Sequence, residues 1–96
     1  MVRRQATLDG RWALVTGAAK RIGAVITRTL HEAGANVAIH YNRSAAEADA
    51  LAAELNRARA KSAFTVAADM LDIEAVEGMA RQVLDRIGQD LSLIHI

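Results

Sequence analysis

The 96-residue sequence contains no cysteine and has one tryptophan, one tyrosine and one phenylalanine. The lack of cysteine excludes a disulfide framework and a thiolate metal site, and three rings are too few for a stacking platform on single-stranded nucleic acid. The formal net charge of +1 provides no bulk attraction to nucleic acid or to an anionic membrane. No apolar run approaches the roughly 18 residues that a membrane span needs. No apolar segment follows the basic N-terminus, so we expect no signal peptide and a cytoplasmic location.

Strand-like and helix-like segments alternate along the chain. Short apolar runs, typical of strands buried in a parallel sheet, lie at 12–15, 37–41 and 63–67. Each run is followed by residues whose apolar positions recur at helical spacing, and Gly34 and Gly88 stand where the first and third helices would end. This β-α-β-α-β-α order predicts right-handed crossovers and a parallel sheet in which the second strand lies between the first and the third.

The same apolar positions predict which residues of each helix face the sheet. These are Ile22, Val25, Ile26, Leu30 and Ala33 in the first helix, Ala48, Leu51, Leu55 and Ala58 in the second, and Ile73, Val76, Ala80, Val83 and Ile87 in the third. We expect a capping box from Ser44 to Glu47 to open the second helix, its serine and glutamate side chains binding backbone N–H groups. Asp72 is expected to cap the third helix.

Residues 91–96, Leu-Ser-Leu-Ile-His-Ile, allow two interpretations. They come where a fourth strand is due, and that strand would pair with the first. Alternatively, they are a non-native tail, such as a translated sequencing adapter, joined to a truncated gene. Residues 1–90 are accordingly expected to form the N-terminal part of one nucleotide-binding domain, with 91–96 either its fourth strand or foreign to it.

A glycine-containing turn, Thr-Gly-Ala-Ala-Lys-Arg-Ile-Gly at 16–23, joins the first strand to the first helix. The N–H groups and the dipole at a helix N-terminus can bind a pyrophosphate. Gly17 would allow the tight turn and Gly23 the close packing of helix on strand. The G-x-G-x-x-G spacing is absent, and a P-loop is excluded because residue 22 is not glycine. The prediction is an α/β, partial Rossmann fold with helices on both faces of a parallel sheet, whose three or four strands follow the order 3-2-1 or 3-2-1-4.

The turn at 16–23 resembles the T-G-x-x-x-G-x-G fingerprint of the short-chain dehydrogenase/reductase family, with Arg21 in place of the middle glycine. Together with His-Tyr-Asn-Arg-Ser-Ala-Ala-Glu at 40–47, it resembles the pteridine reductase branch, and the resemblance extends over about residues 11–88. It implies an NADPH-dependent reductase that passes hydride to the C=N bond of a pterin or dihydrofolate. A 3-oxoacyl-carrier-protein reductase or another carbonyl reductase, and a nucleotide-binding module without catalysis, are the alternatives.

The expected cofactor is NADP rather than NAD. In an NAD-binding unit a carboxylate at the end of the second strand accepts hydrogen bonds from the ribose 2′-OH, but no Asp or Glu lies between residues 34 and 47. Arg43 and Ser44 instead offer a guanidinium and a hydroxyl to a 2′-phosphate. The resemblance also implies that Arg21 lies near the pyrophosphate and the pterin pocket and that Asp69-Met70 contacts adenine, although Asp69 could equally be a turn residue. The expected cofactor-binding residues are Gly17, Lys20, Arg21, Ile22, Gly23, Tyr41, Asn42, Arg43, Ser44, Asp69 and Met70.

No catalytic residue is expected within these 96 residues, and we expect the chain alone to show no reductase activity. The family's catalytic Tyr-x-x-x-Lys pair is absent, because the single tyrosine, Tyr41, is followed four residues later by Ala45. His31, His40 and His95 have no partner at metal-ligand spacing, so core or surface roles are expected and no metal. For a full-length parent, the resemblance implies a homotetramer that acts on a pterin or another carbonyl or imine substrate, with no nucleic acid or membrane partner.

Overall fold

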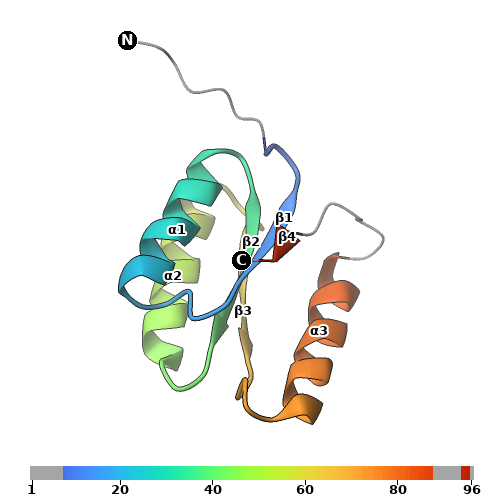
Figure 1. Ribbon diagram of the computed structural model, residues 1–96. Coiled ribbons are helices and arrows are strands. Elements are labelled where there is room, and N and C mark those ends of the chain that lie inside the picture. Colours follow the sequence, from blue (N-terminus) through green and yellow to red (C-terminus); the bar gives the residue numbers. More distant parts are fainter. Residues whose placement is uncertain (1–7, 88–93, 96) are drawn as a thin grey trace.

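A single parallel sheet runs through the computed structural model, which describes residues 8–87 and 94–95. Its strands within these residues are β1 (Trp12–Val15), β2 (Asn36–Tyr41), β3 (Ala63–Ala67) and β4 (Ile94–His95). The strand order is β3-β2-β1-β4, as Figure 1 shows, with β4 beside Ala13 and Leu14 of β1. The order predicted from the sequence is therefore confirmed, including the fourth position. Residues 91–93 and 96 of the proposed tail lie outside the described residues, and the origin of 91–96 stays a prediction.

Helices cover both faces of the sheet, as predicted. The helices are α1 (Arg21–Glu32), α2 (Ala45–Ala58) and α3 (Ile73–Ile87). Figure 1 shows α1 and α2 on one face and α3 on the other. Successive residues of a strand point to opposite faces, so Ala13, Val15 and Val37 join the core under α1 and α2, while Leu14 and Ala38 join the core under α3. Both faces of β1 and β2 are therefore apolar, which explains their continuous apolar runs.

The predicted inner face of α1 is wrong at its first turn. Ile22 and Val25 are 75% and 61% exposed, and the buried residues of the helix are Ala24, Thr27 and His31. Small and polar side chains face the sheet because the start of α1 packs against the preceding loop too closely for a large one, and Thr27 Oγ1 donates to the Gly23 carbonyl at 2.7 Å. Ile26, Leu30 and Ala33 are partly buried, in line with the prediction.

The start of α2 also differs from the expectation. Ser44 occupies the N-cap position, but its side chain makes no capping hydrogen bond, so the predicted capping box is wrong. The backbone angles of Ser44, φ −97° and ψ +53°, lie outside the extended region that directs an N-cap hydroxyl at the helix N–H groups. Ala48, Leu51 and Leu55 are buried as predicted, whereas Ala58 is exposed and Ala52 faces the core in its place.

In α3 the predicted cap is confirmed and the predicted face is partly wrong. Asp72 Oδ1 accepts hydrogen bonds from the N–H groups of Glu74 and Ala75 at 3.0 and 3.3 Å. Ile73 is 74% exposed and Ala80 is exposed, because the core-facing residues form a row at four-residue intervals that includes the predicted Val83 and Ile87 but neither of these two. That row consists of Ala75, Met79, Val83 and Ile87, and the predicted Val76 is partly buried.

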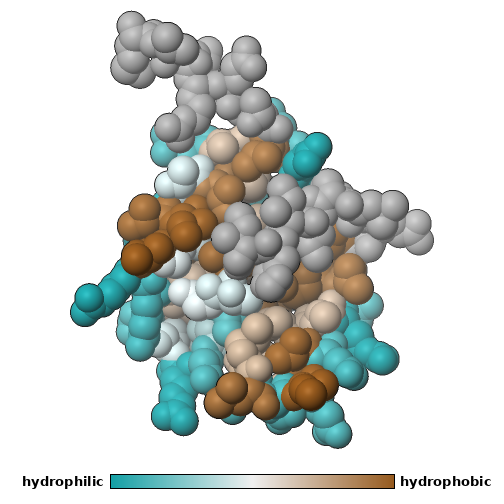
Figure 2. All heavy atoms as spheres, in the orientation of Figure 1, coloured by the Kyte–Doolittle hydropathy of each residue, from teal (hydrophilic) through white to brown (hydrophobic). Residues whose placement is uncertain are grey.

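Among the described residues, exposed large apolar side chains gather at two places on the surface, and Leu84 of α3 is exposed apart from them. Figure 2 shows one over the first turns of α1, formed by Ile22 and Val25, and one at the turn from β3 into α3, formed by Met70, Leu71 and Ile73. Among the described residues, no helix combines the length and apolar character needed to cross a membrane.

Polar side chains connect the end of α1 to the beginnings of β2 and β3. Gly34 follows the helix with φ +105°, as expected of a helix-ending glycine. Arg59 donates to the backbone carbonyls of His31 and Ala35, and His31 Nε2 lies 2.6 Å from Ser62 Oγ. Burial and the nearby Arg59 charge lower the pKa of His31. This end of the sheet is therefore held by a polar network built around the His31 imidazole. The predicted cap Gly88 of α3 lies outside the described residues.

Candidate functional site

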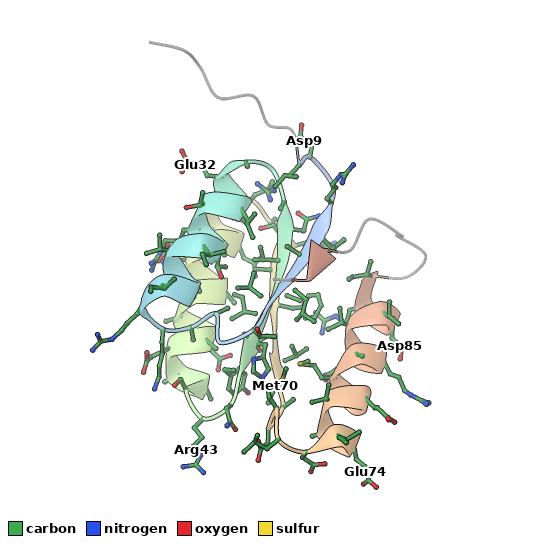
Figure 3. The ribbon with its side chains drawn as sticks, viewed as in Figure 1. Asp9, Glu32, Arg43, Met70, Glu74 and Asp85 are labelled. Carbon is green, nitrogen blue, oxygen red and sulfur yellow. The ribbon has the colours of Figure 1, made fainter. Side chains whose placement is uncertain are left out.

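A cavity of about 400 Å³ opens where β1 and β2 end. It lies between the loop that leads from β1 into α1 and the turn that leads from β2 into α2. Its lining residues are Gly17, Ala19, Lys20, His40, Tyr41, Asn42, Arg43 and Ser44. In open parallel sheets, ligands bind in such a crevice outside the carboxyl ends of the strands. Figure 3 shows Arg43 and Met70 at this end of the sheet and Asp9 and Glu32 at the opposite end.

The cavity brings together six of the eleven residues predicted to bind the cofactor, namely Gly17, Lys20, Tyr41, Asn42, Arg43 and Ser44. The other five, Arg21, Ile22, Gly23, Asp69 and Met70, do not line it. Gly23 lies in the first turn of α1 and packs against the backbone of Gly17, and Ile22 is exposed on α1. Asp69 and Met70 follow β3, and Asp69 Oδ1 accepts the N–H of Leu71 at 2.9 Å, which is the local turn role.

The loop from residue 16 to residue 23, which we call the phosphate loop, requires both of its glycines. Gly17 has a backbone φ of +63°, in the left-handed region that residues other than glycine rarely adopt. A Cβ added to Gly23 would lie 2.1 Å from the Gly17 carbonyl oxygen and 2.9 Å from its carbon. The first glycine therefore sets the turn, and the second lets α1 begin directly against it.

Arg21 adopts a backbone conformation that favours glycine. Its φ of +44° lies in the left-handed region, at the position where the family fingerprint has its middle glycine. An L-residue held there costs about 1–2 kcal/mol relative to the right-handed conformation. The arginine thus adds an exposed cationic side chain directly after Lys20, which lines the cavity. Strain of this kind concentrates at functional sites.

The lining of the cavity is cationic. Lys20 and Arg43 are both exposed, and none of the lining residues is a carboxylate. Ser44 is half-buried beside them, and its hydroxyl is not used as a helix cap. A guanidinium, an ammonium and a hydroxyl are the groups that proteins use to bind phosphate. Within residues 8–87 and 94–95, no three side chains of the metal-ligating types come together at one place.

Sequence reasoning missed the role of His40, which was expected to be an ordinary core or surface histidine. His40 is only 3% exposed and lies in the wall of the cavity. Nδ1 accepts the Gly17 N–H at 3.0 Å, Nε2 lies 2.8 Å from the Ala68 carbonyl oxygen, and the Ala18 N–H donates to the His40 backbone carbonyl at 3.0 Å. The sequence signal that could have indicated this role is a polar ring near the end of the buried strand β2, which pairs with β1, the strand before the phosphate loop.

Together, the parallel sheet, the glycine turn at the start of α1 and the cavity at the strand ends define a Rossmann-type α/β protein. Comparison with known sequences narrows this class. Residues 11–95 match the short chain dehydrogenase family, and the chain therefore belongs to that family, whose members are oxidoreductases that generally bind NAD or NADP.

The chain is similar to several curated reductases. It is 56% identical over 61 residues to pteridine reductase 1 of Leishmania tarentolae, an alignment that covers 64% of this chain and 21% of that protein. It is 40% identical over 82 residues to versicolorin reductase 1 of Dothistroma septosporum, covering 85% and 31%. It is 37% identical over 76 residues to a 3-oxoacyl-[acyl-carrier-protein] reductase of Staphylococcus aureus, covering 79% and 30%. The chain thus spans between a fifth and a third of the length of these relatives.

Proposed function

We propose that this chain forms the NADP(H)-binding part of a short-chain reductase that acts on a pterin or dihydrofolate. The observation that carries the cofactor assignment is the cavity at the end of β2, where Arg43 and Ser44 stand and no carboxylate lines the wall. A carboxylate there would repel a 2′-phosphate, whereas a guanidinium binds it through paired charge-assisted hydrogen bonds. Lys20 adds a second positive charge from the phosphate loop.

The residues at the site fit the adenosine end of the cofactor. A volume of about 400 Å³ lies within the usual range of small-molecule sites, and its charge suits a phosphorylated ribose. The N-terminus of α1 and the phosphate loop would hold the pyrophosphate. NADPH, when bound, supplies the hydride. The part played by these residues is to bind and orient the nucleotide and to select the phosphorylated form.

The substrate assignment rests on the similarity to pteridine reductase 1 at 56% identity and on Arg21, which the resemblance implies to lie near a pterin. The longer alignment with the 3-oxoacyl-[acyl-carrier-protein] reductase supports an acyl thioester substrate as the second candidate. Assaying NADPH oxidation by the full-length parent with dihydropterin and with acetoacetyl thioester separates the two. Turnover of the thioester alone would contradict the pterin assignment.

The cofactor assignment is tested by replacing Arg43 with alanine and measuring NADPH and NADH dissociation constants by calorimetry. One charge-assisted phosphate contact contributes roughly 1.5–3 kcal/mol, so NADPH affinity should fall about 10- to 100-fold while NADH affinity changes little. Arg57→Ala is the matched control, because Arg57 is an exposed arginine in the last turn of α2 and does not line the cavity. Equal losses for both nucleotides would show that Arg43 does not bind the 2′-phosphate.

A converse variant tests the same selectivity in the other direction. Asn42→Asp introduces a carboxylate at the end of β2, where NAD-binding units carry one. We expect this variant to bind NADPH more weakly and NADH more tightly than the wild type does. A variant that retained the full preference for NADPH would contradict the role assigned to this turn.

A further inference from the structure

His40 connects three segments of the chain that end at the same edge of the sheet. Its ring contacts Gly17, which follows β1, and Ala68, which follows β3, while His40 itself belongs to β2. The Ala68 N–H also donates to the backbone carbonyl of Tyr41 at 3.2 Å. One side chain therefore fixes the phosphate loop relative to the segment that carries Asp69 and Met70.

The partners of His40 determine its protonation and its tautomer. Gly17 offers an N–H, so Nδ1 must accept and cannot carry a hydrogen. Ala68 offers a carbonyl oxygen, so Nε2 must carry the hydrogen and donate it. The ring is thus the neutral Nε2–H tautomer. A protonated ring would direct a second N–H at the N–H of Gly17 and break that contact.

His40 also determines which loop groups remain to face a ligand. The N–H groups of Gly17 and Ala18, the first two residues after Thr16, are both engaged by His40, one by the ring and one by the backbone carbonyl. Donors for a pyrophosphate must then come from the loop beyond Ala18 and from the N-terminus of α1. Because the ring holds Gly17, it sets where those later donors point.

We propose that His40 is a positioning residue of the nucleotide site, and that its Nδ1 contact with Gly17 holds the phosphate loop in the conformation that binds NADP(H). This inference rests on the proposed function, since it assigns the loop to that nucleotide. An apolar side chain at this position would fill the space but would remove the ring partner of the Gly17 N–H and leave the Ala68 carbonyl oxygen, buried beside the ring, without that hydrogen bond.

Two conservative variants separate the two ring contacts. Asparagine can place an amide oxygen near the position of Nδ1 and retain the contact with Gly17, whereas glutamine can place an amide N–H near Nε2 and retain the contact with Ala68. If the Gly17 contact positions the loop, His40→Asn should bind NADPH nearly as tightly as the wild type. His40→Gln and His40→Ala should bind it about 2- to 10-fold more weakly, the effect of losing one neutral hydrogen bond.

His31 provides the matched control, because it is also buried and hydrogen-bonded but lies at the opposite end of the sheet. His31→Asn and His31→Gln should lower thermal stability without changing the NADPH dissociation constant. A role for His40 in folding alone would give the same result at position 40, with lower stability and unchanged affinity, and that result would overturn the proposal.

Nuclear magnetic resonance of the wild-type protein tests the proposal without any variant. Long-range proton–nitrogen correlations of the His40 ring should show the Nε2–H tautomer, and the Gly17 amide should be protected from hydrogen exchange. The Nδ1–H tautomer, or a rapidly exchanging Gly17 amide, would overturn the inference while leaving the proposed function intact. Failure of the wild-type protein to bind either nucleotide would overturn the proposed function and, with it, the inference about His40.

Discussion

Replacing Gly23 with alanine would place a methyl group between α1 and the phosphate loop. The new Cβ would lie 2.1 Å from the Gly17 carbonyl oxygen and 3.0 Å from Ala18 Cα, and both are backbone atoms that cannot rotate away. Ordinary contacts of this kind begin near 3.4 Å, so the loop and the helix must separate by roughly 1 Å. Such a movement would also draw the Gly17 N–H away from His40, which it now meets at 3.0 Å.

The expected cost exceeds the benefit that alanine brings to a helix. Overpacking costs about 1–3 kcal/mol, and a clash between two backbone segments belongs at the upper end of that range. Alanine is favoured over glycine by up to about 1 kcal/mol within a helix, and by less near its start. Gly78 is the matched control, because it lies inside α3 with nothing within 4 Å of an added Cβ. Gly78→Ala should therefore stabilise the protein by about 0.5–1 kcal/mol.

Urea unfolding and thermal melting, both followed by far-ultraviolet circular dichroism, compare the two variants with the wild type. In a domain of this size, each 1 kcal/mol corresponds to a shift of roughly 4–8 °C in Tm, so the two alanine variants should melt on opposite sides of the wild type. NADPH affinity should fall in Gly23→Ala and stay unchanged in Gly78→Ala. If both variants were stabilised to the same extent, α1 would not pack against Gly17 as described.

Two further predictions concern strained and titratable residues. Arg21→Gly should stabilise the protein by up to about 1 kcal/mol, because glycine adopts a φ of +44° without strain, while Arg21→Ala should not; a less stable glycine variant would contradict the strain argument. Burial and Arg59 lower the pKa of His31, so the unfolded chain binds more protons than the folded one once the pH falls below about 6.5. The contribution of His31 to stability should therefore be complete above that pH and be lost on acidification. Urea titrations between about pH 7.5 and 5 should show a shallower decline for His31→Gln than for the wild type, and identical slopes would refute the assignment.

Strand positions and sheet order could be predicted because they depend on features that are local in the sequence. The continuous apolar run at residues 12–15 has few alternatives to a strand buried on both faces, and the handedness of successive crossovers then fixes the order. The faces of the helices were harder to predict. Thr27 and His31 point inward with their polar groups satisfied by the Gly23 carbonyl one turn earlier in α1 and by Ser62, and hydrophobic periodicity does not identify polar residues of this kind.

In the candidate site, too, the residues with local sequence signals could be predicted and those that depend on distant contacts could not. Gly17, Gly23 and the cationic turn at Arg43 are recognisable because their residue types are unusual for their positions. His40 could not be assigned in this way, since its ring contacts lie 23 and 28 residues away in the chain. Ser44 shows the converse error. A capping box is a local pattern, but the backbone angles of Ser44 differ from those of a capping residue and its side chain does not form the cap.

Two aromatic rings on the α3 side of the sheet, Trp12 and Phe64, make tryptophan fluorescence a probe of this part of the protein. Trp12 is the chain's single tryptophan, and its ring centroid lies 5.3 Å from that of Phe64, over which the Arg86 guanidinium of α3 sits at 4.5 Å. Trp12 opens β1, so it is separated from Gly17 by roughly 16 Å of extended chain. Its emission should therefore follow the docking of α3 on the sheet. Fluorescence and nucleotide titrations on one sample can thus distinguish loss of the α3 layer from rearrangement of the phosphate loop.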